Sequence, residues 1–135
     1  RIFQKDVDEI LNLVDCDISR MEFSQWDASK TPVFHCNRAK AKCRLVDFFK
    51  EGKVEFNLIL SSLKNLPQKD RQLQECERAL GEVFESEEKI LGERNCWSLG
   101  DVIIAITMPP ECLMYTTNKK HFQVLTKTLR KKMFE

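Results

Sequence analysis

Apolar residues recur every three or four positions in several parts of the chain, and this spacing predicts amphipathic helices. Ser19 is followed three residues later by Glu22, which is the pattern of a capping box, so a helix is expected to begin there. Another helix is expected to end at Gly52, because glycine readily adopts the left-handed conformation that closes a helix. The segments predicted to be helical are, approximately, residues 5–14, 19–26, 37–52, 68–91 and 124–133.

Alternating positions predict strands elsewhere in the chain. Within residues 53–60, Val54, Phe56 and Leu58 would share one face of an extended backbone. This alternation predicts a strand with one buried face. Residues 113–116 are expected to form a second, shorter strand.

The apolar run at residues 102–107 fits two structures. Its β-branched side chains favour a buried strand, whereas Ser98 followed three residues later by Asp101 is typical of a helix start. Helical and extended segments alternate along the chain, and this order predicts an α/β layer fold. The length of 135 residues, without an internal repeat or a linker-like stretch, predicts one domain over residues 1–135.

Composition narrows the class of protein. Apolar residues make up 42% of the chain and charged residues 32%, as is usual for soluble globular proteins. The longest apolar run, residues 102–106, is much shorter than a bilayer span, and no signal peptide is visible. We therefore expect a cytoplasmic protein with no membrane partner. Because 22 basic residues nearly balance 21 acidic ones, binding to a polyanion would need a local basic patch.

The six cysteines show neither a zinc clamp nor a thiol redox motif, since no two lie closer than seven residues apart. We expect reduced and mostly buried thiols, such as Cys76 between two leucines. A nucleophilic pair of His35 with Cys36 or Cys112 stays open, although nothing in the sequence orders one.

Three oxygen-bearing side chains stand at predicted element ends. Glu22 and Asp101 lie in the first turns of predicted helices, and Asn118 follows the strand at residues 113–116. In a parallel α/β sheet such positions gather at one edge, where a few oxygen ligands suit Mg²⁺ or Mn²⁺. The alternative is that both carboxylates only stabilise their helices, by about 0.3–1 kcal/mol each, and that Asn118 is a turn residue.

Two stretches in the C-terminal half resemble PIN domains. Residues 100–105, Gly-Asp-Val-Ile-Ile-Ala, resemble the family's helix that opens with an acidic residue, and residues 113–122 resemble its strand ending in Thr-x-Asn. Residues 18–23 are similar to the strand-to-helix junction that supplies another acidic residue in that family.

This resemblance implies a three-layer α/β/α sandwich with a mainly parallel central sheet, and it favours a helix at residues 102–107. It also implies a metal-dependent endoribonuclease, in which Mg²⁺ or Mn²⁺ lowers the pKa of a bound water and neutralises charge on the phosphate. Glu22, Asp101 and Asn118 would be the metal-binding and catalytic residues, and Thr116 would orient the turn before Asn118.

The sequence departs from the family in two places. The family's first strand and its acidic residue have no counterpart after Arg1, and Asn118 is neutral where many relatives have a carboxylate. Because ligand charge drives the affinity for divalent cations, this chain alone is expected to be an incomplete or inactive nuclease. A segment before Arg1 would have to supply the missing strand.

Three hypotheses about function follow. The first is a PIN-like endoribonuclease, for example one of the toxin type, and the second is a degenerate PIN-like module that binds RNA or a protein without cutting. The third is an unrelated α/β domain in which Glu22 and Asp101 are only helix caps. An antitoxin-like partner, a larger assembly or a homodimer would be compatible with the first two. Candidate RNA contacts are Lys119, Lys120 and His121, with a second basic stripe formed by Arg38, Lys40, Lys42 and Arg44.

Overall fold

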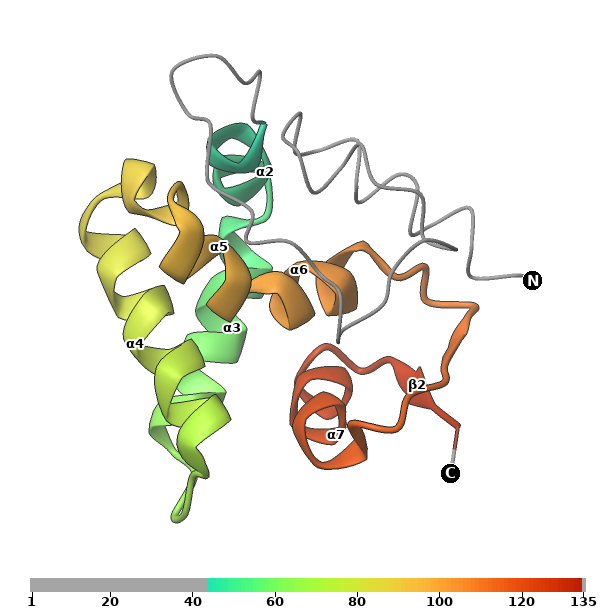
Figure 1. Cartoon of the computed structure of the whole chain (residues 1–135). Coiled ribbons are helices and arrows are strands. Elements are labelled where there is room, and N and C mark those ends of the chain that lie inside the picture. The colour runs from blue at the N-terminus through green and yellow to red at the C-terminus, as the bar shows by residue number, and fades with distance from the viewer. Residues whose placement is uncertain (1–43, 135) are drawn as a thin grey trace, which may run out of the picture.

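The computed structural model describes residues 44–134, and this part of the chain is mainly helical (Figure 1). Helices account for 68% of it. The α-helices are α2 (Leu45–Glu51), α3 (Lys53–Lys64), α4 (Arg71–Glu85), α5 (Glu93–Ser98), α6 (Gly100–Thr107) and α7 (Lys119–Thr128), and a 3₁₀-helix, η2 (Glu87–Ile90), follows α4.

The predicted α/β/α sandwich with a central parallel sheet is wrong for the described residues. The strands there are β1 (Leu113–Met114) and β2 (Lys132–Met133), which pair in parallel over two residues each. A ribbon of this size cannot form the middle layer of a sandwich, because each layer must offer a continuous apolar face to the next. Helices packed on helices form the core instead.

The segment predicted as a strand at residues 53–60 is helix α3. The prediction placed Val54 and Leu58 on a buried face, but they are 71% and 49% exposed. The buried residues of this helix follow helical spacing, and they are Phe56, Ile59, Leu60 and Leu63. Packing explains the choice, because the ring of Phe56 lies 5.0 Å from that of Phe49 in α2, and a strand could not bury the whole apolar set on one side.

Gly52 ends α2 as predicted, but with a φ of −98° and not in the left-handed region. The same residue precedes the first turn of α3, so the chain passes from one helix into the next with little extra backbone. A Cβ at this position would lie 3.3 Å from the carbonyl oxygen of Phe48, which makes a larger residue tight there.

Helix α4 confirms the predicted apolar stripe but is shorter than the predicted range of 68–91. It begins after Asp70, whose side chain accepts a hydrogen bond from the backbone N–H of Leu73 at 2.9 Å. This is a helix cap of the usual type. It ends at Glu85, and the chain continues as the 3₁₀-helix η2. The buried residues of α4 are Leu73, Cys76, Ala79, Leu80 and Val83.

Two helices were predicted in the C-terminal part of the chain, and the structure confirms the first and shifts the second. Residues 102–107 are helical, as the family resemblance favoured, and they lie within α6. The helix predicted at 124–133 instead spans 119–128, because the chain reverses at Arg130, which has a φ of +56°, and enters β2. Lys131 then donates hydrogen bonds of 2.7 Å to the carbonyl oxygens of Ala105 and Ile106 at the end of α6.

Several predictions fall on residues 1–43 and therefore lie outside the described part of the chain. They include the helices at 5–14 and 19–26, Glu22, the pair His35 and Cys36, and most of the basic stripe at 38–44. Within the described part, Cys76 and Cys112 are buried, as expected. None of the described helices is long and apolar enough to cross a membrane.

Candidate functional site

The structure places Asp101, Asn118 and His121 in one polar cluster. Asp101 lies in the first turn of α6, and its Oδ2 is 2.8 Å from Nδ1 of His121 in the first turn of α7. Gln72 in α4 donates a hydrogen bond from Nε2 to the same oxygen at 3.2 Å. The side-chain amide of Asn118 in turn donates to Oε1 of Gln72 at 3.5 Å. We refer to Gln72, Asp101, Asn118 and His121 as the Asp101 cluster.

The side chain of Thr116 contacts this cluster at the backbone of Asn118. Its hydroxyl oxygen accepts a hydrogen bond from the backbone N–H of Asn118 at 3.1 Å, which fixes the turn that leads into α7. Lys119 and Lys120 occupy the first turn of α7 and are exposed. Two lysines at a helix N-terminus, without an acidic neighbour in that turn, concentrate positive charge there.

His121 is almost completely inside the protein, with 2% of its side chain exposed, whereas the Asp101 side chain is 28% exposed. Nε2 of His121 is buried and has no hydrogen-bond partner among the described residues. A carboxylate that orients an imidazole is the arrangement of a general base. Here the nitrogen that would take the proton is buried, and the Asp101–His121 contact joins α6 to α7.

The described members of the predicted metal site do not form such a site by themselves. Asp101 is the only carboxylate of the cluster, and its Oδ2 already accepts two hydrogen bonds. No group of three His, Cys, Asp or Glu side chains suited to a metal ion occurs between residues 44 and 134. The Mg²⁺ or Mn²⁺ site therefore stays a prediction that depends on Glu22, outside the described residues.

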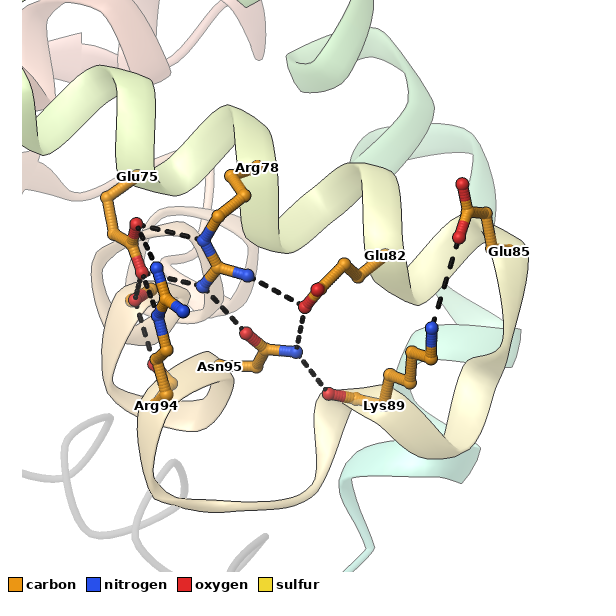
Figure 2. Close-up of polar contacts among 8 residues, drawn as sticks. Glu75, Arg78, Glu82, Glu85, Lys89, Arg94 and Asn95 are labelled. Atoms are coloured by element: carbon orange, nitrogen blue, oxygen red, sulfur yellow. Dashed lines mark hydrogen bonds and ion pairs between the residues drawn. The ribbon is translucent and has the colours of Figure 1, made fainter.

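The sequence analysis missed a second polar group, which joins α4 to α5 (Figure 2). The carboxylate of Glu75 accepts hydrogen bonds of 2.6 and 2.9 Å from the guanidinium of Arg78 and of 3.0 and 3.3 Å from that of Arg94. The hydroxyl of Ser98 donates to it at 3.1 Å. The hydrogen bonds from Arg78 and Arg94 hold the pKa of Glu75 well below its usual range. We call Glu75, Arg78, Glu82, Arg94 and Asn95 the Arg78 network.

Asn95 completes the Arg78 network from α5. It is 9% exposed, and its amide donates to Glu82 at 2.9 Å and to the carbonyl oxygen of Lys89 at 2.7 Å. Its oxygen accepts from Arg78 at 2.9 Å, and Arg78 also binds Glu82 at 2.7 Å. Glu82 thus takes part in the contact between α4 and α5. The spacing of 75, 78 and 82 on one helix face was the available signal.

An open hollow lies beside this network, between the first half of α4 and α5. Two glutamine side chains and three guanidinium groups line it, together with one carboxylate. The lining residues are Arg71, Gln72, Gln74, Glu75, Arg78 and Arg94.

A further surface is the outer face of the β1–β2 ribbon. Leu113 pairs with Lys132 in the parallel register, and side chains two residues apart in a strand share a face. Tyr115 and Phe134 therefore lie on the same side, with ring centroids 5.4 Å apart. Leu113, Tyr115 and Phe134 are 53%, 80% and 51% exposed. We call Leu113, Tyr115, Lys132 and Phe134 the ribbon face.

No family model matches this chain, and no curated protein or solved structure is significantly similar to it. The resemblance to PIN domains thus remains a prediction from a few short stretches of sequence.

Proposed function

We propose that this domain binds single-stranded RNA through its C-terminal segment and does not cleave it. The observation that carries the proposal is the ribbon face, where two neighbouring aromatic rings are largely open to solvent. Two adjacent exposed rings form an apolar surface on which the faces of unpaired bases can stack.

Charge distribution supports a nucleic acid as that partner. Residues 112–134 contain six lysines and arginines and no aspartate or glutamate, although the whole chain carries a net charge of only +1. Because the whole chain is nearly neutral, binding to a polyanion needs a local basic patch, and this stretch provides one. Lys131 is used inside the fold, whereas Lys119, Lys120, Lys127, Arg130 and Lys132 are exposed.

A single strand fits this surface better than a duplex does. In a duplex the base faces are covered by their neighbours, so exposed rings gain nothing from them. In a single strand each base can stack on an aromatic ring, worth about 1–3 kcal/mol per base, while basic residues neutralise the backbone.

Absence of cleavage is proposed from the Asp101 cluster. Its one carboxylate is engaged by His121 and Gln72, and the free imidazole nitrogen is buried. We therefore infer that residues 44–134 bind without the divalent-cation chemistry that the PIN resemblance implies.

The test is fluorescence anisotropy with a 5′-hydroxyl oligouridylate of about 12 nucleotides, a length suited to one small binding surface. We expect Tyr115→Ala and Phe134→Ala each to weaken binding by about 5- to 150-fold, the equivalent of one lost stacking contact. Leu58→Ala is the matched control, because Leu58 is also an exposed apolar residue but lies on α3. It should leave the affinity unchanged.

Salt dependence gives a second measure. If four exposed basic residues neutralise phosphates, affinity should fall about 50-fold between 50 and 200 mM salt. Binding that is unchanged by both aromatic substitutions would contradict the proposal. Sedimentation should show a monomer, since self-association through the ribbon face would mean that a second copy is its partner.

A further inference from the structure

The hollow between α4 and α5 is not explained by the RNA surface, which lies on other elements. Three guanidinium groups line it against one carboxylate, that of Glu75. Three positive charges placed close together repel one another, and one carboxylate does not balance them. An anion in the hollow would reduce this repulsion if the arginines still have N–H groups that can bind it.

The carboxylate of Glu75 is paired with groups of the protein itself. Its two oxygens receive hydrogen bonds from Arg78, Arg94 and Ser98. The Arg78 guanidinium is also committed, since it binds Glu82 and Asn95 in addition to Glu75. Neither group therefore has much capacity left for a ligand.

Arg71 and Arg94 do have free donors. Arg94 uses Nε and Nη2 on Glu75, and its Nη1 has no hydrogen-bond partner in the described part of the chain; 72% of its side chain is exposed. Arg71 is exposed, and its side chain makes no hydrogen bond or ion pair with any described residue. The hollow thus offers N–H groups from two arginines that come from different helices.

We propose that this hollow binds a phosphate monoester, held by Arg71 of α4 and Arg94 of α5. Guanidinium groups match the oxygens of phosphate with paired hydrogen bonds, and a monoester carries more charge than the diester of an RNA backbone. The Glu75 carboxylate fixes the Arg94 side chain in place, so less conformational freedom is lost on binding. A free nucleotide and the 5′-phosphate end of an RNA would both present this group.

The experiment is calorimetric titration of the full chain with inorganic phosphate and with adenosine monophosphate at low salt. We expect saturable binding with a Kd of about 0.1–1 mM, which is usual for a small ligand held by a few charged contacts. Arg71→Gln should raise the Kd about tenfold, and the double variant Arg71→Gln/Arg94→Gln should remove measurable binding. Because the exposed Arg71 side chain makes no hydrogen bond or ion pair in the described part of the chain, its substitution should change stability little.

The matched control is Lys50→Gln/Lys64→Gln, which removes the same net charge from exposed positions on α2 and α3, outside both the hollow and the basic C-terminal stretch. It should change the Kd by less than twofold. The proposal is refuted if neither ligand gives saturable heat up to about 10 mM, or if the control weakens binding as much as the double variant does.

Two oligonucleotides distinguish the sources of the phosphate and separate this proposal from the previous one. If RNA ends are the ligand, an oligouridylate with a 5′-phosphate should bind several times more tightly than its 5′-hydroxyl form, and Arg71→Gln should abolish the difference. Equal affinities together with binding of adenosine monophosphate would assign the site to a free nucleotide. The 5′-hydroxyl form reports on the ribbon face alone, so either proposal can fail without the other.

Discussion

Asn95 provides the sharpest test of how the small helix α5 is held against α4. Asn95 is 9% exposed, and its side chain makes three hydrogen bonds, one each with Glu82, the Lys89 carbonyl and the Arg78 guanidinium. Replacing it with alanine removes all three at once. Glu82 and Arg78 still bind each other at 2.7 Å, so those two charges stay paired.

The magnitude follows from these contacts. A hydrogen bond contributes about 0.5–1.5 kcal/mol net, and one to a charged group about 1.5–3 kcal/mol, but exposed charges recover part of this from water. The Lys89 carbonyl loses its side-chain partner in a partly buried place. We therefore expect Asn95→Ala to lower the free energy of unfolding by about 2–3 kcal/mol, or roughly 6–15 °C in Tm.

Urea denaturation followed by circular dichroism measures this change, with an unaltered m-value showing that the native state remains compact. Asn57→Ala is the control, since Asn57 is an exposed helical asparagine on α3. It should change stability by less than about 0.5 kcal/mol. If the two variants unfold at the same urea concentration, the Arg78 network does not hold α5 to α4 and the reasoning fails.

Three further outcomes are expected. Lys131→Met should lower stability by about 1–3 kcal/mol in thermal unfolding, because the carbonyls of Ala105 and Ile106 lose a charged donor; an unchanged Tm would show that water replaces it. Because its folded-state pKa lies below the ordinary value of 4.5, Glu75 adds stability above pH 4.5 that is lost as the pH falls further. Glu75→Gln should therefore flatten the acid side of the stability profile, and an equally steep profile would contradict this. Finally, incubation of RNA with the protein and Mn²⁺ should give no cleavage; cleavage that Asp101→Asn abolishes would restore the nuclease hypothesis.

The helical spacing of α4 was readable from the sequence because its apolar residues all fall on one stripe and are all needed in the core. The segment at 53–60 was not, since its apolar residues satisfy an alternating and a helical pattern at once. The helix is favoured over the strand because Phe56 packs on Phe49, and the Phe49 ring also lies 5.0 Å from that of Phe84. These contacts join three helices and cannot be seen in a window of eight residues.

The PIN resemblance shows the same limit. The helix that it favoured at residues 102–107 is present within α6, and of the strand expected at residues 113–116 only Leu113–Met114 is present, as β1. The layered sheet is absent from residues 44–134, where the sheet has two strands. A larger sheet needs several strands that pair over long distances in the chain, and a short motif does not specify them.

Residue order alone was enough to predict the apolar stripe of α4 and a buried Cys76, because each depends on neighbours within a few positions. The partners of the polar side chains came from packing. Asp101 meets Gln72 and His121, 29 and 20 positions away, since α4, α6 and α7 converge there, and Glu75 meets Arg94 because α5 folds back on α4. Spacing along the chain orients a side chain on its own helix, but the helix packed opposite determines what that side chain contacts.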